Sequence, residues 1–346
     1  MQYIFTTGTT GKEKGIVLSY KNVSVTAESV MCGLKMKKDN IELVTSPLNH
    51  AHGLRRYYGN MYNGSTVIIQ RSIMDIRSFF ANIEEYKVTA IAIVPAALTT
   101  VLRLSGNKLS EYSEQIRYIQ IGSAPVLEDI VKQLSILLPK TSIYNFYGSS
   151  EGGCICVYDL NCENLKIHSI GKPINKTKVI IVDDEHNEIK SSKENTGFIA
   201  TIGEMNMLGY WKDKEETKKV LINGIVYSND VAFIDEDGDI ILLGRRGDVI
   251  NVGGNKVSPE EIENAAKKIE GVIDCVCIPI KDKAKGNVPK LFVQLDSNKE
   301  FNPIEIRKFL ATKLENYKVP AIIEQIKEVP RSFNGKLLRR KLQDLN

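Results

Sequence analysis

The chain has 346 residues, of which 42% are hydrophobic and 25% are charged, and its formal net charge is +4. This length is enough for two or three domains with a sizeable buried core, and the composition is ordinary for a soluble globular protein. Because basic and acidic residues alternate and no apolar run approaches the roughly 20 residues that span a bilayer, a nucleic-acid coat, a polybasic membrane anchor and a membrane span are excluded.

The first candidate functional segment is FTTGTTGKEKG, residues 5–15. Its three glycines allow positive φ, so that backbone N–H groups can turn inward around an anion. Four threonine hydroxyls add hydrogen-bonding groups, and Lys12 and Lys14 add positive charge. The segment predicts a phosphate-cradling loop, although it lacks the G-x-x-x-x-G-K-[ST] spacing of a Walker A loop.

From about residue 64, short apolar runs alternate with helical patterns. We expect strands at 66–70, 90–95, 117–122 and 142–148, and helices at 75–87, 95–104 and 126–139. Strands that alternate with helices of this length predict βαβ units and a parallel sheet. The strands are apolar throughout, which is typical of parallel strands covered on both faces.

After residue 150 the pattern becomes β-rich. Strands are expected in KVIIVDD, GFIATIG and VAFIDEDGDIILLG, and the last is a hairpin with residues 235–238 at its tip. We therefore predict an α/β protein with a large N-terminal domain, 1–243. This domain combines parallel-sheet βαβ layers with a β-rich subdomain at about 165–243.

The Gly-rich, charged segment GRRGDVINVGG predicts a domain boundary, with a hinge at about 244–248. The residues after it, 244–346, predict a small, mobile C-terminal α+β domain. We expect helices near 258–269 and 303–316, strands in VIDCVCIP, in LFVQL and near 322–329, and a terminal basic helix. Glu260, Glu261 and Glu263 begin the first of these helices, where carboxylates suit the helix dipole, so we interpret them as structural. The basic cluster Lys336–Lys341 is typical of a solvated helix face.

The six cysteines form no C-x-x-C pair, but four of them form two C-x-C pairs inside apolar runs: Cys154 with Cys156, and Cys275 with Cys277. On a strand this spacing places both thiols on one face. We expect buried free thiols rather than metal ligands. Free thiols fit a reducing cytoplasm, and the first residues lack the pattern of a signal peptide, so we expect a cytoplasmic protein.

The segment 5–15 resembles the phosphate-binding signature of the adenylate-forming superfamily, which includes acyl-CoA synthetases, firefly-luciferase-like enzymes and peptide-synthetase adenylation domains. Glu13 stands where that signature usually has proline. Further segments resemble family motifs in the same order: PLNHAHGL (47–54), IGSAPV (121–126), NFYGSSEGG (145–153), the run 226–263, and VPRSFNGKLLRRKL (329–342). The resemblance therefore covers essentially the whole chain.

The resemblance implies an ATP- and Mg²⁺-dependent ligase that activates a carboxylic acid as its acyl-AMP, releases pyrophosphate and passes the acyl group to a thiol, that of CoA. Both reactants of the first step are anionic, so positioning and charge neutralisation supply most of the catalysis. The implied catalytic residues are Lys336, His50, Ser150 and Glu151, and Glu151 is also the implied metal ligand. The implied cofactor-binding residues are Thr6, Thr7, Gly8, Thr9, Thr10, Gly11, Lys14, Gly122, Ser123, Ala124, Pro125, Tyr147, Gly148, Asp230, Arg245, Gly253 and Gly254.

Within this set, the resemblance assigns separate tasks. Lys14 would hold the β- and γ-phosphates, and Tyr147 would stack on adenine. Asp230 would accept hydrogen bonds from the ribose hydroxyls, with Arg245 near the ribose and phosphate. Lys336 would bridge the carboxylate and the α-phosphate. His50 has its role from the motif alone, and the other three histidines are interpreted as structural.

The chain departs from the family pattern at several positions. Ser150 replaces a threonine but keeps a hydroxyl, Asn229 replaces the glycine of the usual T-G-D, and Gly247 stands where many members carry a hinge Asp or Lys. Glycine can still absorb a large dihedral change at a hinge. Family members also carry a long portion before the phosphate loop, which leaves a naturally short member, a fragment or half of a split enzyme as interpretations.

Two alternatives stay open beside the CoA ligase. One is a stand-alone adenylating enzyme that loads the phosphopantetheine of a carrier protein, and the other is a non-catalytic nucleotide-binding remnant. The expected partners are a small carboxylic acid and CoA or a carrier protein, with no nucleic acid, and a homodimer is left open. Residues near His50 and in 120–126 and 145–153 are expected to line the acid pocket. Arg55 and Arg56 could face a polar acyl group, but we interpret them as surface residues.

Overall fold

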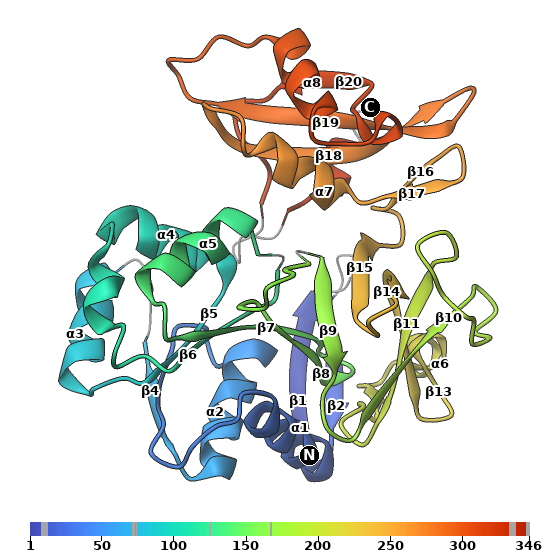
Figure 1. Cartoon of the computed structure of the whole chain (residues 1–346). Coiled ribbons are helices and arrows are strands. Elements are labelled where there is room, and N and C mark those ends of the chain that lie inside the picture. The colour runs from blue at the N-terminus through green and yellow to red at the C-terminus, as the bar shows by residue number, and fades with distance from the viewer. Residues whose placement is uncertain are drawn as a thin grey trace. The chain divides into compact units, whose positions relative to one another are not determined.

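The computed structural model of the chain describes residues 1–7, 13–70, 73, 75–124, 126–166, 168–331 and 337–343, and for residues 6 and 7 it describes the backbone (Figure 1). The chain folds into two compact units. Unit 1 comprises Met1–Ile189, Phe198–Ser228 and Ile234–Ile241, and unit 2 comprises Lys190–Gly197, Asn229–Phe233 and Leu242–Asn346. The domain boundary predicted from the sequence, between residues 243 and 244, stays a prediction.

A parallel sheet forms the centre of unit 1, as the sequence predicts. Its strands run in the order β4-β3-β5-β6-β7, and all neighbours are parallel. The strands are β3 (Ile41–Val44), β4 (Thr66–Ile69), β5 (Ala90–Ile93), β6 (Tyr118–Gly122) and β7 (Ser142–Ser149). The predicted α/β fold class is therefore confirmed.

Helices cover both faces of this sheet (Figure 1). On one face lie α3 (Ile76–Glu85), α4 (Pro95–Ser105), the 3-10 helix η1 (Lys108–Tyr112) and α5 (Glu128–Leu137). Their starts follow local chemistry, because the Asp75 side chain accepts from Ser78 N and Pro95 occupies the first turn of α4. On the other face lie α1 (Tyr20–Gly33) and α2 (Ala51–Asn63), two helices that the sequence analysis did not predict.

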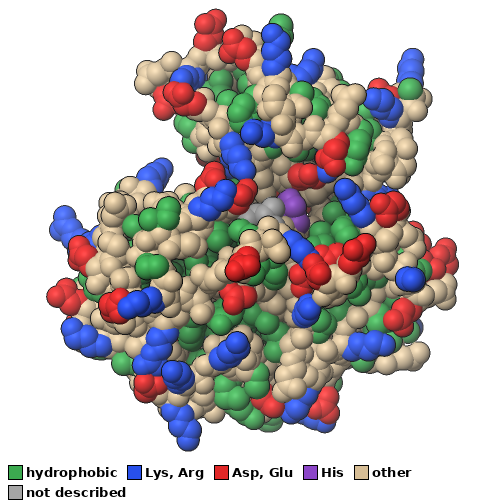
Figure 2. Space-filling model, viewed as in Figure 1, with side chains coloured by type: hydrophobic (Ala, Val, Ile, Leu, Met, Phe, Trp, Pro, Cys, Tyr) green, Lys and Arg blue, Asp and Glu red, His purple; other side chains and the backbone are tan. Residues whose placement is uncertain are grey.

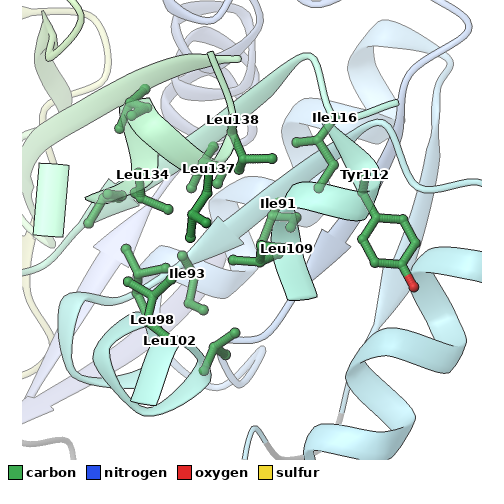
Figure 3. Close-up of a cluster of buried hydrophobic side chains, with 14 of the residues drawn as sticks. Ile91, Ile93, Leu98, Leu102, Leu109, Tyr112, Ile116, Leu134, Leu137 and Leu138 are labelled. Carbon is green, nitrogen blue, oxygen red and sulfur yellow. The ribbon is translucent and has the colours of Figure 1, made fainter. Parts of the chain in front are cut away.

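The two faces of the sheet carry different cores, because successive side chains of a strand point to opposite faces. Leu43, Ile91, Ile119 and Ile143 pack against α3, α4 and α5, in the largest apolar cluster, part of which Figure 3 shows. Full burial of such a side chain contributes roughly 1.5–3 kcal/mol. The alternate positions Ala90, Tyr118, Tyr144 and Phe146 pack against Val30 and Leu34 of the α1 segment.

The β-rich segment continues the same hydrogen-bonded sheet in the order β10-β11-β14-β15-β9-β8-β7, and its pairs β10–β11, β15–β9, β9–β8 and β8–β7 are antiparallel. The added strands are β8 (Gly153–Asp159), β9 (Ser169–Pro173), β10 (Thr177–Val182), β11 (Gly197–Gly203), β13 (Leu221–Ile222), β14 (Ile225–Ile234) and β15 (Ile240–Arg245). The predicted hairpin between β14 and β15 is confirmed. Lys166 stabilises its turn by contacting Asp235, Asp237 and Asp239.

A small antiparallel sheet carries the ends of the predicted phosphate loop. It has the order β1-β2-β12, with β1 (Gln2–Thr7), β2 (Glu13–Leu18) and β12 (Gly209–Tyr210). The helix α6 (Lys214–Val220) follows β12 and begins at Asp213, whose side chain accepts from Glu216 N. Ile4, Ile16, Leu18, Met207 and Tyr210 form the core of this region.

Within unit 2, the elements from Ile250 onward form the α+β arrangement that the sequence predicts for residues 244–346. Its strands are β16 (Ile250–Val252), β17 (Asn255–Val257), β18 (Val272–Asp282), β19 (Gly286–Leu295) and β20 (Ile322–Gln325). Its helices are α7 (Pro259–Ala266), α8 (Pro303–Ala311), η2 (Asn316–Lys318) and α9 (Arg340–Gln343). The helix expected over 303–316 ends at Ala311, because its last turn tightens to bonds from Thr312 N to Phe309 O and from Lys313 N to Leu310 O.

For the charged side chains of unit 2, the expectation of a solvated basic cluster is wrong at Arg339, and the structural role expected for the carboxylates of α7 is confirmed for two of them. Arg339 belongs to the basic cluster that we interpreted as solvated, yet its side chain is only 10% exposed and binds both oxygens of Glu263 at 2.8 Å. Arg339 is largely buried because Glu263, a buried carboxylate, requires a charged partner. Glu263 and Glu261, which binds Lys318, have the structural roles we expected.

The cysteines of both C-x-C pairs are buried and free, as expected, whereas Cys32 and Cys162 are exposed. Burial raises the pKa of the Cys156 and Cys275 thiols well above the usual range. None of the described helices is long and apolar enough to cross a membrane. On the face shown in Figure 2, basic and acidic side chains are interspersed, in agreement with the small net charge.

The expectation that Arg55 and Arg56 are surface residues is wrong for Arg56, whereas Arg55 is half-buried. Arg56 is 1% exposed, and its guanidinium binds both oxygens of Glu42, with Nη2 at 2.7 Å from Oε2 and Nε at 3.0 Å from Oε1. Asn60, one turn further along α2, donates to the same carboxylate. Although burial alone would lower it, the pKa of Arg56 is raised by the Glu42 carboxylate. This buried pair joins α2 to β3.

We predict that Arg56→Met lowers the free energy of unfolding by about 3–5 kcal/mol, because it leaves the Glu42 carboxylate buried without its cation. The matched control is Arg117→Met, which removes a two-bond arginine–carboxylate pair with Asp39 on the protein surface. Urea unfolding should give a far smaller loss for the control. Equal losses for the two variants would contradict the assigned role of the buried pair.

Candidate active site

The predicted phosphate loop connects β1 and β2, which pair antiparallel with Thr6 opposite Lys14 and Thr7 opposite Glu13. The residues predicted to turn around the phosphates, Gly8, Thr9, Thr10 and Gly11, lie outside the described residues, as do the side chains of Thr6 and Thr7. The strand register nevertheless fixes both ends of the loop. Lys14, the lysine of the 5–15 segment that the structure describes, lies on β2. This strand lies beside the β12–α6 segment, because Trp211 N donates to Gly15 O at 2.6 Å.

Lys14 and Glu151 are connected through a third side chain, Tyr210. The Lys14 ammonium lies 5.1 Å from the centre of the Tyr210 ring, and the Tyr210 hydroxyl donates to Glu151 Oε1 at 2.8 Å. Lys14 Nζ also binds Glu216 Oε2 at 2.5 Å. Burial and the Glu151 carboxylate raise the pKa of Tyr210 far above the usual range, so the phenol remains a donor. The structure thus brings together two predicted site residues, on β2 and after β7.

The segment that carries Tyr147, Gly148, Ser150 and Glu151 forms the end of β7 and the turn into β8. Arg55 of α2, a half-buried residue, holds this turn by donating to Ser149 O at 2.6 Å and to Gly153 O at 3.1 Å. Gly148 is required by close packing, since a Cβ there would lie 2.2 Å from Gly153 O. Tyr147, Ser150 and Glu151 are all half-buried.

The predicted adenine-side turn follows β6. Gly122 is buried at the strand end, and Ser123 and Ala124 are exposed. Ser123 has a φ of 72°, an unusual value for a residue other than glycine, and such strained residues concentrate at functional sites. Pro125 lies outside the described residues. A Cβ on Gly122 would come within 2.9 Å of Gln120 Nε2 and 3.6 Å of His52 Nε2, so side chains from α2 and β6 meet beside this turn.

His50 and His52 have different environments at the start of α2. His50 is the N-terminal cap residue, and its side chain does not cap the helix. His52, which we interpreted as structural, lies between Ser46 Oγ and Gln120 Oε1, at 2.9 Å from each. Gly53 permits this position, because a Cβ there would meet Ser46 O at 2.4 Å.

Burial, with a further contribution from Arg56, lowers the pKa of His52 from 6.5 to about 4. The imidazole is therefore neutral, Nε2–H donates to Gln120 Oε1, and Nδ1 accepts from the Ser46 hydroxyl. This arrangement agrees with the structural interpretation of His52 and shows that its hydrogen-bonding positions are filled from within unit 1.

Asp230 and Arg245 form a separate pair in unit 2. Arg245 Nε lies 3.2 Å from Asp230 Oδ1, and the Asp230 side chain is 14% exposed. The two residues come from neighbouring strands, β14 and β15, and Arg246 N donates to Asn229 O at 2.7 Å beside them. The structure thus brings together the two residues that the sequence assigned to the ribose.

Glycines with positive φ mark the predicted hinge and the predicted thiol-side motif. Gly247 has a φ of 90° in an exposed turn that follows β15, and a Cβ there would meet no atom within 4 Å. Gly253 and Gly254, with φ of 57° and 96°, connect β16 to β17 as a two-residue hairpin turn. Such a turn requires positive φ at both positions, which glycine adopts freely. Lys336 lies outside the described residues.

The sequence did not predict several residues that organise these groups, namely Tyr210, Glu216, Gln120 and, through its contacts with the β7–β8 turn, Arg55. Each acts across a long sequence separation, 202 residues in the case of Lys14 and Glu216. The local sequence carries no signal for such contacts. Among the described residues, no three His, Cys, Asp or Glu side chains gather as a metal cage.

Two family models together match most of the chain. The model of the family described as "AMP-binding enzyme" matches residues 1–211, and that of the "AMP-binding enzyme C-terminal domain" matches residues 261–336. The 2-succinylbenzoate–CoA ligase of Bacillus cytotoxicus is 29% identical over 347 residues, which cover 100% of this chain and 70% of the relative. The corresponding enzyme of Bacillus mycoides is 28% identical, with the same coverage.

Two solved structures have a fold similar to that of nearly the whole chain. The o-succinylbenzoate CoA synthetase of Bacillus subtilis, in complex with its acyl-adenylate intermediate, superposes with a TM-score of 0.87 at 25% identity, covering 99% of this chain and 68% of that one. The ATP-bound MatB of Rhodopseudomonas palustris has a TM-score of 0.86 at 23% identity, covering 99% and 67%. The second likeness concerns the fold alone.

We predict that the His52 imidazole does not titrate between about pH 5 and about pH 8, where an unperturbed histidine changes its charge. The cause is the burial that lowers the pKa of His52 to about 4. The measurement is the imidazole proton resonance in an NMR pH titration, assigned by its loss in His52→Asn. A midpoint near 6.5 would show that the imidazole is solvated and would contradict the buried arrangement.

Between about pH 4 and pH 6.5, His52 is protonated in the unfolded chain but neutral in the folded protein. Protonation therefore favours the unfolded chain, and this histidine makes the protein less stable as the pH falls through that window. In His52→Asn this part of the pH dependence should be absent.

Proposed function

The chain belongs to the AMP-binding enzyme family, and we propose that it activates a carboxylic acid as an acyl-AMP, releases pyrophosphate and transfers the acyl group to the thiol of CoA. The observation that supports this most is the connection of Lys14 to Glu151 through Tyr210, in a fold that superposes on an acyl-adenylate complex at a TM-score of 0.87. It joins the ends of the phosphate loop to the carboxylate assigned to the metal.

The first step needs positive charge more than it needs covalent chemistry. The attacking carboxylate and the α-phosphate repel each other, so cations and donors around the developing charge lower the barrier. We assign Lys14 and the backbone of residues 6–11 to the β- and γ-phosphates, and the Ser150 hydroxyl to the α-phosphate. Lys336 bridges the carboxylate and the α-phosphate, and His50 lies at the acid side, at the start of α2.

The residues present fit a magnesium ion held together with nucleotide phosphates. Mg²⁺ prefers oxygen ligands and is commonly bound by one or two carboxylates plus phosphates and water. Glu151 offers such a carboxylate, half-buried and oriented by Tyr210, and the described residues contain no all-protein cage that would compete. When bound, the ion neutralises phosphate charge, while Tyr210 keeps the Glu151 carboxylate in place.

Residues of both units are assigned to the adenosine part of the nucleotide. In unit 1 we assign Tyr147 to stacking on adenine, and Gly122, Ser123, Ala124, Pro125 and Gly148 to its edges. In unit 2 we assign Asp230 to the ribose hydroxyls. Asp230 Oδ1 lies 3.2 Å from Arg245 Nε, which orients the carboxylate, and its oxygens can accept from hydroxyl donors.

For the second step we propose that unit 2 turns about Gly247, so that Lys336 and the Gly253–Gly254 turn reach the site in two different orientations. The support is that Gly247 is exposed and has a φ of 90°, because glycine tolerates large dihedral changes. The Gly253–Gly254 turn carries no side chains, which suits the approach of a narrow pantetheine chain.

We predict that the wild-type protein releases pyrophosphate from ATP and Mg²⁺ only when a suitable acid is present, and that Lys336→Ala abolishes this release. The panel of acids begins with 2-succinylbenzoate, the acid named for the relatives, and extends to other aromatic and dicarboxylic acids. Lys341→Ala, in the same basic cluster, is the control. Transfer to CoA from a supplied acyl-adenylate should survive in Lys336→Ala. Adenylation by Lys336→Ala within about tenfold of the wild-type rate, a difference of 1.4 kcal/mol in barrier, would contradict the assignment.

We also predict that Gly247→Pro slows one half-reaction about tenfold more than the other, because proline fixes φ near −65° where the structure has 90°. Single-turnover rates of adenylation and of thiol transfer are the measurement. Gly224→Pro is the control, since Gly224 also has a positive φ, of 81°, and open space around it, but lies in unit 1. Equal slowing of both half-reactions would favour a static enzyme.

A further inference from the structure

The Glu216 carboxylate binds two lysines at once. Its Oε2 lies 2.5 Å from Lys14 Nζ, and its Oε1 lies 2.5 Å from Lys219 Nζ. These hydrogen bonds, first from Lys14 and then from Lys219, lower the pKa of Glu216 to about 2, so the carboxylate is ionised throughout the physiological range. Glu216 lies on α6 and Lys14 on β2, so the pair joins the small sheet to the helix that follows β12.

Lys14 is held in this pair by its surroundings. Its side chain is 16% exposed, and its ammonium lies over the Tyr210 ring, 5.1 Å from the centre. The backbone of the same tyrosine pairs with β2, and its hydroxyl binds Glu151. The Lys14 charge is therefore neutralised by a protein carboxylate at the position where the proposed function requires it to bind phosphate.

Phosphate oxygens and the Glu216 carboxylate present the same chemistry to an ammonium group, so they compete for it. When a phosphate takes Lys14, Glu216 keeps Lys219 and does not become an unpaired charge. Lys219 is 68% exposed and remains solvated in either arrangement. Lys14 can therefore exchange between the carboxylate and a phosphate without leaving Glu216 unpaired.

We propose that Glu216 is a positioning residue that competes with the β- and γ-phosphates for Lys14. It weakens the binding of triphosphate and pyrophosphate relative to AMP, and it takes Lys14 back when pyrophosphate leaves. The inference rests on the proposed function, because it requires Lys14 to bind the terminal phosphates. Glu216 is not part of the phosphate-loop motif, residues 5–15.

The test is calorimetric binding of three ligands in the presence of Mg²⁺: α,β-methylene ATP, inorganic pyrophosphate and AMP. Glu216→Gln should bind the ATP analogue and pyrophosphate about fivefold more tightly than the wild type, the lower end of typical coupling between sites. AMP, which lacks the competing phosphates, should bind with unchanged affinity. Steady-state assays should show the same shift as stronger product inhibition by pyrophosphate.

The matched control is Glu215→Gln, which removes the neighbouring carboxylate of α6, whose lysine partner is Lys218 rather than Lys14. It should leave all three affinities unchanged. In a Lys14→Met background, Glu216→Gln should no longer alter the affinity for pyrophosphate, because the competition has been removed. Thermal melting of each variant checks that the fold is retained.

Equal or weaker binding of the ATP analogue by Glu216→Gln would overturn the inference, since a carboxylate that merely aligns Lys14 would give that result. The same gain in Glu215→Gln, or an equal gain for AMP, would also overturn it by showing a general charge effect. A wild-type protein that binds none of the three ligands would overturn the proposed function itself. Binding by the wild type without a gain in Glu216→Gln would overturn the inference alone.

Discussion

The buried ion pair between Arg56 and Glu42 constrains the arrangement of unit 1. Both side chains are almost completely buried, so each needs the other, because an isolated charge in the interior is strongly unfavourable. Three side chains of α2, spaced four residues apart, face the sheet: His52 reaches Gln120 on β6, and Arg56 and Asn60 reach Glu42 on β3. This polar contact fixes the rotation of α2, and with it the positions of His52 beside Gly122 and of Arg55 under the turn that carries Glu151.

A second set of contacts connects the phosphate loop to the rest of unit 1. The β12–α6 segment pairs with β2, provides Tyr210 for Glu151 and provides Glu216 for Lys14. This segment therefore adds to the hairpin between β1 and β2 in holding the loop ends. The proposed metal ligand and the proposed phosphate ligand are thus positioned by the same tyrosine. In the proposed function, residues far apart in the sequence therefore act on one nucleotide.

The parallel strands and helices α3, α4 and α5 could be predicted because their apolar residues repeat with the periods of a buried strand and an amphipathic helix. Helices α1 and α2 could not be predicted in this way. α2 contains Gly53 and Gly59, which disfavour a helix locally, but Gly59 allows close packing, since a Cβ there would meet Val30 at 2.6 Å. The motifs predicted which residues belong together, such as Asp230 with Arg245. They could not predict that Arg56 is buried or that Glu216 binds Lys14, because those facts depend on partners 14 and 202 residues away.

We propose that this chain joins a carboxylate oxygen to the α-phosphate of ATP. The most direct measurement uses a carboxylic acid labelled with ¹⁸O in its carboxylate, incubated with the protein, ATP, Mg²⁺ and CoA, followed by mass spectrometry of the nucleotide product. Attack of the carboxylate on the α-phosphate places a labelled oxygen in AMP when the acyl group is transferred to the thiol. We predict labelled AMP and unlabelled pyrophosphate. Formation of ADP, or label in phosphate rather than AMP, would contradict the account.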